Sequence, residues 1–502
     1  MVRQRRAGRL PRRNPRGRRA PVPPAVARRQ APARPIDPRS PHGSSLLQLE
    51  GVSPPSPIPT ARRLGLPFPS SYPRRRPRSQ RMNAGATDPM IPQAQPPSLE
   101  GNLRRYPFFS AVSFTPFMVP VLVLFWQDNG LDLFEIFLLQ GIYAIAVVLC
   151  EVPTGMVADR VGKKTSLLAG CFLVFMGVVI YAVGHGFAVF LVAESILAVA
   201  TTFFSGADSA LLYDTLKALD RTGEFKAFEG RARAIQMIVF ALCNLIGGFV
   251  GSHSYRATLW MTALGPAAAF CFALGFREVN RPGEGASWKG HLDGYRTLIG
   301  DAVKFVRKHR LVRWQILFLG VLSGSSTWLL WLYQPYMSFC GLPVWAFGIA
   351  FALFNLFAAL SSHFAHDFDA SFGRSGTLLM MILLQIVPLF LMSVLIHPLS
   401  FLLILGHQGV RGLSGPIMSE RILRYTFADK RATVLSISSL SGRFFFASTA
   451  PLVGLIARHT TLPQDLALQG AILTMVFLGL FMEYRRIPQK YFTVKSSVTE
   501  RQ

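Results

Sequence analysis

The chain has 502 residues, of which 50% are hydrophobic and only 16% are charged, and 40 of them are phenylalanine. This composition is too apolar for an ordinary soluble enzyme and is typical of a membrane protein. The formal net charge of +27 would suggest a nucleic-acid partner if it were spread along the chain. Most of it lies near the start instead, because residues 1–100 hold 20 Arg against four acidic residues and contribute +16.

Residues 1–100 also contain 21 of the 35 prolines and show no sustained apolar period, which predicts a disordered, basic Arg/Pro-rich segment. Such an arm would bind anionic lipid or RNA, but lysine and interleaved aromatic residues are missing, so we expect no nucleic-acid partner. A second interpretation is that the segment is not part of the working protein. Met82 and Met90 offer later starts, and a translated GC-rich upstream region would have this composition.

From Pro107 onward, apolar stretches of roughly 20 residues alternate with polar breaks, and a helix of about 20 residues crosses a ~30 Å hydrocarbon core. They predict an all-α membrane protein with twelve transmembrane helices, at about 107–127, 134–158, 164–184, 187–212, 231–252, 257–276, 313–336, 343–364, 375–395, 398–420, 432–456 and 466–484.

The longest internal break divides these spans six and six, which is the layout of a duplicated transporter. We predict an N-terminal six-helix bundle over 104–276, a linker over 277–312, a C-terminal six-helix bundle over 313–486 and a tail over 487–502.

The breaks differ strongly in charge between the two sides of the predicted membrane. One side carries only Arg256 and Arg458, whereas the other, counted from Arg104, carries 29 Lys and Arg. Because cytoplasmic loops are enriched in positive residues, the basic side is predicted to be cytoplasmic, with both termini and the linker there.

The break between the second and third spans combines glycines with charges in the sequence Gly155-Met-Val-Ala-Asp159-Arg160-Val-Gly162-Lys163-Lys164. The glycines permit a sharp turn, and the charges hold a hairpin at the water boundary. The break after the eighth span, residues 367–374, is a degraded copy in which Ala370 stands where the first copy has Asp159.

The loop closely resembles the signature loop of the major facilitator superfamily, and together with the span pattern the resemblance covers residues 104–490. Residues 151–155, 205–214 and 431–436 look like those of poorly characterised bacterial members, some of them related to drug exporters. The resemblance implies two six-helix bundles that rock around a central cavity lined by spans one, four, seven and ten. It also implies a multi-pass protein of the bacterial plasma (inner) membrane.

The resemblance further implies that this loop is a cytoplasmic gating latch, formed by Gly155, Asp159, Arg160, Gly162, Lys163 and Lys164 with Asp214. Asp159 would lie by the start of the eleventh span, where a helix N-terminus favours negative charge. Arg160 or Lys163 would pair with Asp214 at the cytoplasmic end of span four. Ala370 cannot carry the equivalent charge in the second half.

Ionisable groups inside a span need a reason, since each costs about 2.5–3.5 kcal/mol on insertion scales. In span four, we expect Glu194 and Asp208 to lie on one polar face of the helix together with Thr201 and Ser205. We expect Asp208 or Glu194 to take up a proton, the alternatives being a structural ion pair or a wetted surface carboxylate. Glu151, at the end of span two, is either a proton carrier or a structural partner of the latch cations.

Candidate cavity residues lie in the second half. Arg411 and Arg443 would hold an anionic group or the deprotonated acid, or form a structural salt bridge between bundles. Trp328, Trp331 and Gln334 would form an amphipathic ligand surface, or else serve packing and an aromatic belt. The cysteines and histidines show no metal-ligand spacing, so we expect no metal and no cofactor.

Signatures of soluble enzymes, such as a P-loop or a nucleophile elbow, are missing, so we predict no enzyme. We predict a monomeric secondary active transporter in the lipid bilayer, working by alternating access on a small-molecule substrate with a proton as coupling ion. Export of a small amphipathic molecule is favoured. The alternatives are proton-coupled uptake of a small organic anion, suggested by Arg411 and Arg443, and a transport-inactive scaffold or receptor, suggested by the degraded second loop.

Overall fold

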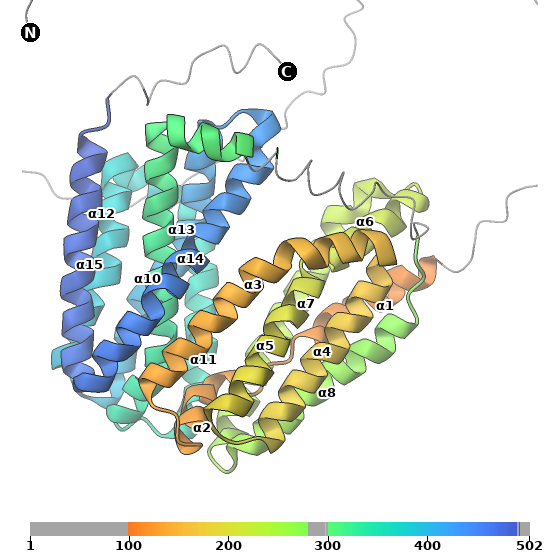
Figure 1. Ribbon diagram of the computed structural model, residues 1–502, viewed down its shortest axis with the longest axis horizontal. Coiled ribbons are helices and arrows are strands. Elements are labelled where there is room, and N and C mark those ends of the chain that lie inside the picture. Colours follow the sequence, from red (N-terminus) through yellow and green to blue (C-terminus); the bar gives the residue numbers. More distant parts are fainter. Residues whose placement is uncertain (1–98, 280–296, 298–299, 489–490, 492–502) are drawn as a thin grey trace, which may run out of the picture. The chain divides into compact units, whose positions relative to one another are not determined.

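The computed structural model describes residues 99–279, 297, 300–488 and 491, and the regular secondary structure in this part of the chain is entirely helical (Figure 1). Almost all of the predicted disordered segment, the centre of the predicted linker and most of the tail lie outside the described residues.

The helices fall into two groups along the sequence. The first group contains α1 (Glu100–Ser113), α2 (Leu122–Asp128), α3 (Leu133–Val161), α4 (Lys163–Val183), α5 (Gly186–Phe204), α6 (Ala207–Ala218), α7 (Phe225–Gly251) and α8 (Tyr255–Leu274). The second contains α10 (Arg310–Phe339), α11 (Val344–His363), α12 (Ala365–Val394), α13 (Ile404–Arg424), α14 (Arg431–His459) and α15 (Leu462–Arg485). Residues 300–308, before α10, are also helical.

Ten helical segments of the described residues are long and apolar enough to cross a membrane, which makes the chain a multi-pass integral membrane protein. Ten of the twelve predicted spans correspond to these segments. The predicted first and tenth spans are helical too, but neither meets the length and composition that define the other ten.

The sequence predicted one continuous helix for the first span, but the structure shows a break in it. α1 ends at Ser113, and only the short 3-10 turn η1 (Val119–Val121) lies between it and α2. Pro116 and Pro120 lack the backbone N–H that a helix needs and disfavour helical geometry in the residue before them, which accounts for the break. The predicted tenth span likewise begins as a 3-10 segment, η3 (Pro398–Leu403), before α13.

The fourth span is also interrupted, and this corrects the expected polar face. α5 ends at Phe204 and α6 begins at Ala207, with Gly206 between them at φ +77°, in the left-handed region that favours glycine. A face shared by Glu194 and Asp208 requires an uninterrupted helix, so the predicted stripe is not formed.

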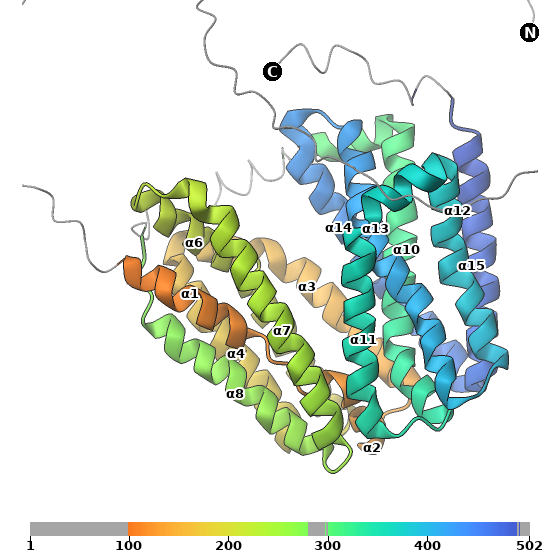
Figure 2. The same ribbon diagram turned by 180° about the vertical axis from the view of Figure 1, so that it is seen from behind.

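Within the first group, α4 packs on α5 and α8, while α1 packs on α7 and α8; within the second, α10 packs on α14, and α13 on α11 and α12. The groups are joined mainly by α3 with α14 and by α7 with α11, the latter pair converging at one end in Figure 2, and also by α10 with α2. At the second of these contacts Gly248 meets Gly348 backbone to backbone.

The groups are tied at one end, which we call the closed end and which comprises residues 119–135, 247–255, 331–348 and 454–462. There Gln334 Oε1 accepts a hydrogen bond from Val123 N (2.8 Å), and Gln334 Nε2 donates to Val119 O (2.8 Å). Asp132 and Arg458 form an ion pair of 3.2 Å across the same boundary. The break in span one frees these backbone groups, and Gln334 satisfies them.

We expect Gly248→Ala to destabilise the contact between the groups. The added Cβ would lie 2.6 Å from Gly348 Cα, and backbone atoms cannot rotate away, so overpacking should cost about 1–3 kcal/mol. The measurement is the thermal unfolding of the purified protein. Gly230→Ala, in the same helix with open space around it, is the control and should be neutral or slightly stabilising. Equal unfolding temperatures for the two variants would contradict the tight contact.

Candidate functional site

The charged loop after α3 is organised around Gly162 and Glu278. Gly162 separates α3 from α4 at φ +102°. The Glu278 carboxylate accepts hydrogen bonds from the backbone N–H groups of Lys163 (3.1 Å) and Lys164 (2.8 Å), which caps the N-terminus of α4 with a negative charge. Sequence reasoning missed Glu278, because it lies more than a hundred residues away from the loop it caps.

The structure brings Lys163 and Asp214 together, since Lys163 Nζ lies 3.8 Å from Asp214 Oδ2 and 3.8 Å from Asp159 Oδ1. Lys164 Nζ donates to Leu274 O (2.9 Å) instead. The Asp159 side chain is 64% exposed, and among the described residues no hydrogen bond or ion pair links it to α14. Arg160 is exposed, and Gly155 lies inside α3 with open space around it.

The second copy of the loop carries a charge that its sequence did not reveal. Gly373 interrupts α12 at φ +63°, as Gly162 interrupts the α3–α4 hairpin. Ala370 is uncharged, but its neighbour Asp369 forms an ion pair with Arg421 near the end of α13, and Arg421 also donates to Arg374 O (3.1 Å). Ala370 itself carries no charge, as the sequence shows, but the carboxylate of the neighbouring residue forms an ion pair in this half.

The two acids of the fourth span have different surroundings. Asp208, at the start of α6, lies 3.6 Å from the guanidinium of Arg233, which also pairs with Glu229 (3.1 Å). Tyr106 completes this network by donating to Glu229 Oε2 (2.8 Å). Asp208 is thus a member of a paired network between α6 and α7.

Glu194 is buried in α5 and is 5% exposed. Gln140 Nε2 of α3 and the Tyr181 hydroxyl of α4 both donate to its Oε1, each at 2.9 Å. No ion pair involves Glu194 in the described part of the chain. Glu151 is half-buried, and among the same residues no ion pair joins it to the latch cations.

Arg443 lies in α14, which packs on α3 of the first group, and its side chain is exposed. On α3, the Tyr143 hydroxyl lies 3.4 Å from Thr201 Oγ1 of α5.

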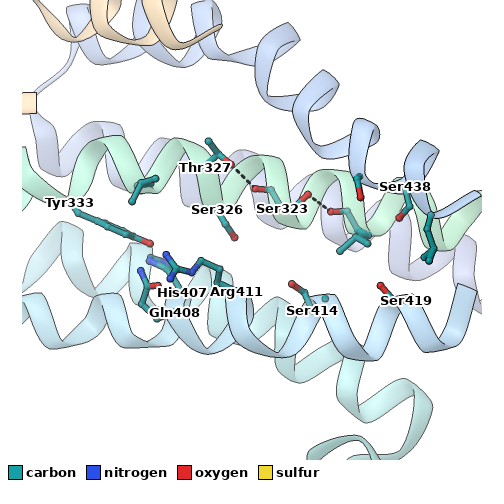
Figure 3. A pocket seen from close by; sticks show the side chains of 15 residues that line it. Ser323, Ser326, Thr327, Tyr333, His407, Gln408, Arg411, Ser414, Ser419 and Ser438 are labelled. Carbon is teal, nitrogen blue, oxygen red and sulfur yellow. Dashed lines mark hydrogen bonds between the residues drawn. The ribbon is translucent and has the colours of Figure 1, made fainter. Parts of the chain in front are cut away.

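A pocket of about 390 Å³ lies in the second group, lined by α10, α13 and α14 (Figure 3). Arg411 reaches into it and donates to Asn355 Oδ1 (2.6 Å); no carboxylate among the described residues forms an ion pair with Arg411. Figure 3 shows Arg411, His407, Gln408 and Tyr333 gathered at one end, with hydroxyl groups along the rest. Its hydroxyl-bearing lining residues, besides Tyr333, are Ser323, Ser326, Thr327, Ser414, Ser419, Ser438 and Ser439.

The predicted aromatic residues of α10 do not line this pocket. Trp328 is buried, donates to Thr449 Oγ1 (3.1 Å) and packs on Phe445. Trp331 lies against Trp126, with ring centroids 5.6 Å apart, and Gln334 binds the backbone at the closed end. The pocket face of α10 follows the helical spacing from Ser323 through Ser326 and Thr327 to Leu330, and Trp328 points away from it.

The sequence analysis did not single out His407 as a pocket residue. Its side chain is buried, and it lines the pocket. The available signal was the group His407, Gln408 and Arg411 within one apolar span.

Comparison with known protein families shows which family has this architecture. The sequence profile of the Major Facilitator Superfamily matches residues 108–451, which is more than half of the chain. The chain belongs to this superfamily.

Individual relatives of this chain match only part of its sequence. Quinolone resistance protein NorA of Staphylococcus aureus (strain N315) is 26% identical over 157 residues, or 31% of this chain. NorA of strain MRSA252 is 28% identical over 149 residues, or 30% of this chain. The matched region spans 39% and 37% of the length of these two relatives.

Solved structures share the fold over most of the described chain. The nucleoside transporter NupG has a TM-score of 0.64 at 15% identity, covering 78% of this chain and 99% of NupG. The peptide transporter POT in complex with sulfate has a TM-score of 0.58 at 14% identity, covering 78% and 94%. These are transporters and not enzymes; at such identities the likeness concerns the fold alone.

We expect Gly162→Ala to destabilise the α3–α4 hairpin. The new Cβ would lie 2.7 Å from Glu278 Oε2, and an L residue is strained at φ +102°, with a cost of about 1–3 kcal/mol. Thermal unfolding of the purified protein measures the effect. Gly155→Ala is the matched control, because nothing lies within 4 Å of its Cβ and it is helical. A destabilisation no larger than that of Gly155→Ala would refute the role assigned to Gly162.

Proposed function

We propose that this protein is a proton-coupled secondary active transporter that moves a small organic anion by alternating access. Its membership of a superfamily with transporter relatives supports transport. Twelve spans follow if α1 with α2 forms a broken first span and η3 with α13 forms the tenth. The excess of Lys and Arg near the latch supports a cytoplasmic position for that end and for both termini, in a bacterial plasma membrane.

The observation that supports proton coupling is the burial of Glu194 without an ion-pair partner among the described residues. A buried ionised carboxylate without a cation is costly, so burial favours the neutral acid. Both hydrogen-bond donors meet Oε1, the arrangement expected when Oε1 is the carbonyl oxygen and Oε2 carries the proton. Asp208 is already paired with Arg233, which makes it the weaker candidate of the two. Arg443, on the helix that packs against α3, would stabilise Glu194 once its proton has left.

Arg411 supports an anionic substrate, because it brings a cation into a polar pocket without a carboxylate partner among the described residues. Uptake of an anion against an inside-negative potential costs about 2.3 kcal/mol per charge for each 100 mV. A proton bound at Glu194 would neutralise the transported charge and remove this cost.

Export of a small amphipathic molecule is the second candidate, and the partial similarity to the quinolone resistance protein NorA favours it. A transport-inactive scaffold has less support, since its basis was the degraded second loop, and Asp369 now supplies an ion pair there.

The proposal is tested with Glu194→Gln in liposomes. Glutamine accepts the same two hydrogen bonds and resembles the protonated acid, so the variant should fold. Substrate exchange at equal concentrations on both sides should persist, whereas proton movement driven by a substrate gradient should fall at least about tenfold. A pH-sensitive dye inside the liposomes follows the protons, and the direction of the pH change separates uptake from export.

Asp301→Asn, an exposed acid outside the predicted spans, is the control and should leave both fluxes unchanged. Full proton coupling in Glu194→Gln would assign the proton to another group. If the double variant Glu194→Gln/Asp208→Asn kept both substrate exchange and proton movement, proton coupling through span four would be rejected.

A further inference from the structure

The described residues that line the Arg411 pocket provide one cationic hydrogen-bond donor, Arg411, and several hydrogen-bond acceptors around it. Of the residues that line it, Arg411 alone carries a charge. Its guanidinium uses one N–H on Asn355, which leaves other N–H groups available to an occupant of the pocket. This end of the pocket therefore favours a carboxylate or another small oxyanion.

Beside Arg411, α13 presents two buried acceptors. His407 is 1% exposed, and its Nε2 lies 3.1 Å from Gln385 O. A carbonyl oxygen only accepts, so Nε2 carries the hydrogen and the neutral ring leaves Nδ1 as an acceptor. His407 Nδ1 and Gln408 Oε1 are both buried without a hydrogen-bond partner among the described residues, although the Gln408 side chain also interacts with Tyr333. An unpaired buried acceptor is unfavourable, which favours a ligand whose donors reach these atoms once it is bound.

The facing wall, on α10, also presents acceptors. The hydroxyl groups of Ser323, Ser326 and Thr327 donate to backbone carbonyls of their own helix at 2.8, 2.8 and 3.0 Å, two of these bonds being visible along the helix in Figure 3. Their hydrogens are thereby used, and the lone pairs of their oxygens remain for the pocket.

We infer that this pocket binds a small organic anion that carries hydroxyl donors close to its carboxylate, that is, a hydroxycarboxylate. The carboxylate would pair with Arg411, and the adjacent donors would reach His407 Nδ1, Gln408 Oε1 and the α10 hydroxyl oxygens. A volume of about 390 Å³ lies near the lower limit of ligand pockets, which suits a molecule of this size. The inference names the substrate class of the transporter proposed above and so rests on that proposal.

A plain fatty acid of the same length would satisfy Arg411 but leave the acceptors unpaired. A neutral polyol would satisfy the acceptors but leave the guanidinium without an anion. The class is therefore defined by two requirements that can be separated with matched compounds.

The test is binding to the purified full chain in detergent, measured by thermal stabilisation and by calorimetry. Four six-carbon probes are compared: gluconate, 2-aminohexanoate, hexanoate and glucitol. Gluconate should bind at least about tenfold more tightly than hexanoate and glucitol. It should also bind more tightly than 2-aminohexanoate, because none of the described residues that line the pocket has a carboxylate to pair with an ammonium, and tighter binding of 2-aminohexanoate would overturn the hydroxyl assignment.

Variants assign the two requirements to their residues. Arg411→Gln should reduce the affinity for the preferred acid at least about tenfold, whereas Arg424→Gln, at the exposed end of the same helix, should not change it. His407→Phe keeps a ring against Tyr333 but removes the acceptor, so the preferred acid should lose its advantage over hexanoate. Gln408→Met provides the same comparison without affecting the contact to Gln385.

Equal affinity for hexanoate and the preferred acid would overturn the donor requirement, and equal affinity for glucitol would overturn the anion requirement. Binding of none of the four probes, or an unchanged affinity in Arg411→Gln, would overturn the assignment. Because binding is measured without a membrane gradient, its failure is separate from a failure of the proton flux in Glu194→Gln.

Discussion

Every backbone N–H and C=O group inside a bilayer needs a partner within the protein, because the hydrocarbon core offers none. The breaks in this fold follow that constraint. Where Pro116 and Pro120 interrupt the first span, Gln334 from the other helix group accepts from Val123 N and donates to Val119 O. A helix break in one group is thus compensated by hydrogen bonds from the other group. The same hydrogen bonds join the two groups at the closed end.

At the opposite end of the helices, charged side chains beside two turns are paired with charged side chains of neighbouring helices. Gly162 and Gly373 each permit a turn with positive φ, and each turn lies beside an ion pair that reaches the last helical turn of a neighbouring helix, Lys163 with Asp214 and Asp369 with Arg421. The two halves therefore share one device with different residues. The sign of the charges is reversed between them, and this is why a comparison of the loop sequences alone underestimated the second copy.

The sequence was sufficient for properties that depend on short stretches of chain. Apolar runs of the right length indicated the membrane helices, and the spacing of Asp159, Gly162 and Lys163 indicated the superfamily. The partners of Glu194 and the cap formed by Glu278 depend on contacts between distant segments, for which one sequence has no signal. The kink at Gly206 could have been suspected from its Ser-Gly pair, but the apolar run around it gave a stronger helical pattern.

The tie through Gln334 has a consequence for the rate at which the closed end can separate. Its two hydrogen bonds hold backbone groups at the break in span one, and losing them in a dry interface would leave the Gln334 amide without partners. Separation has to proceed together with the entry of water, which replaces the amide on Val119 and Val123. If the protein works by the alternating access proposed above, hydration of this boundary, and not the motion of the helices alone, would limit how often it changes the side to which it is open.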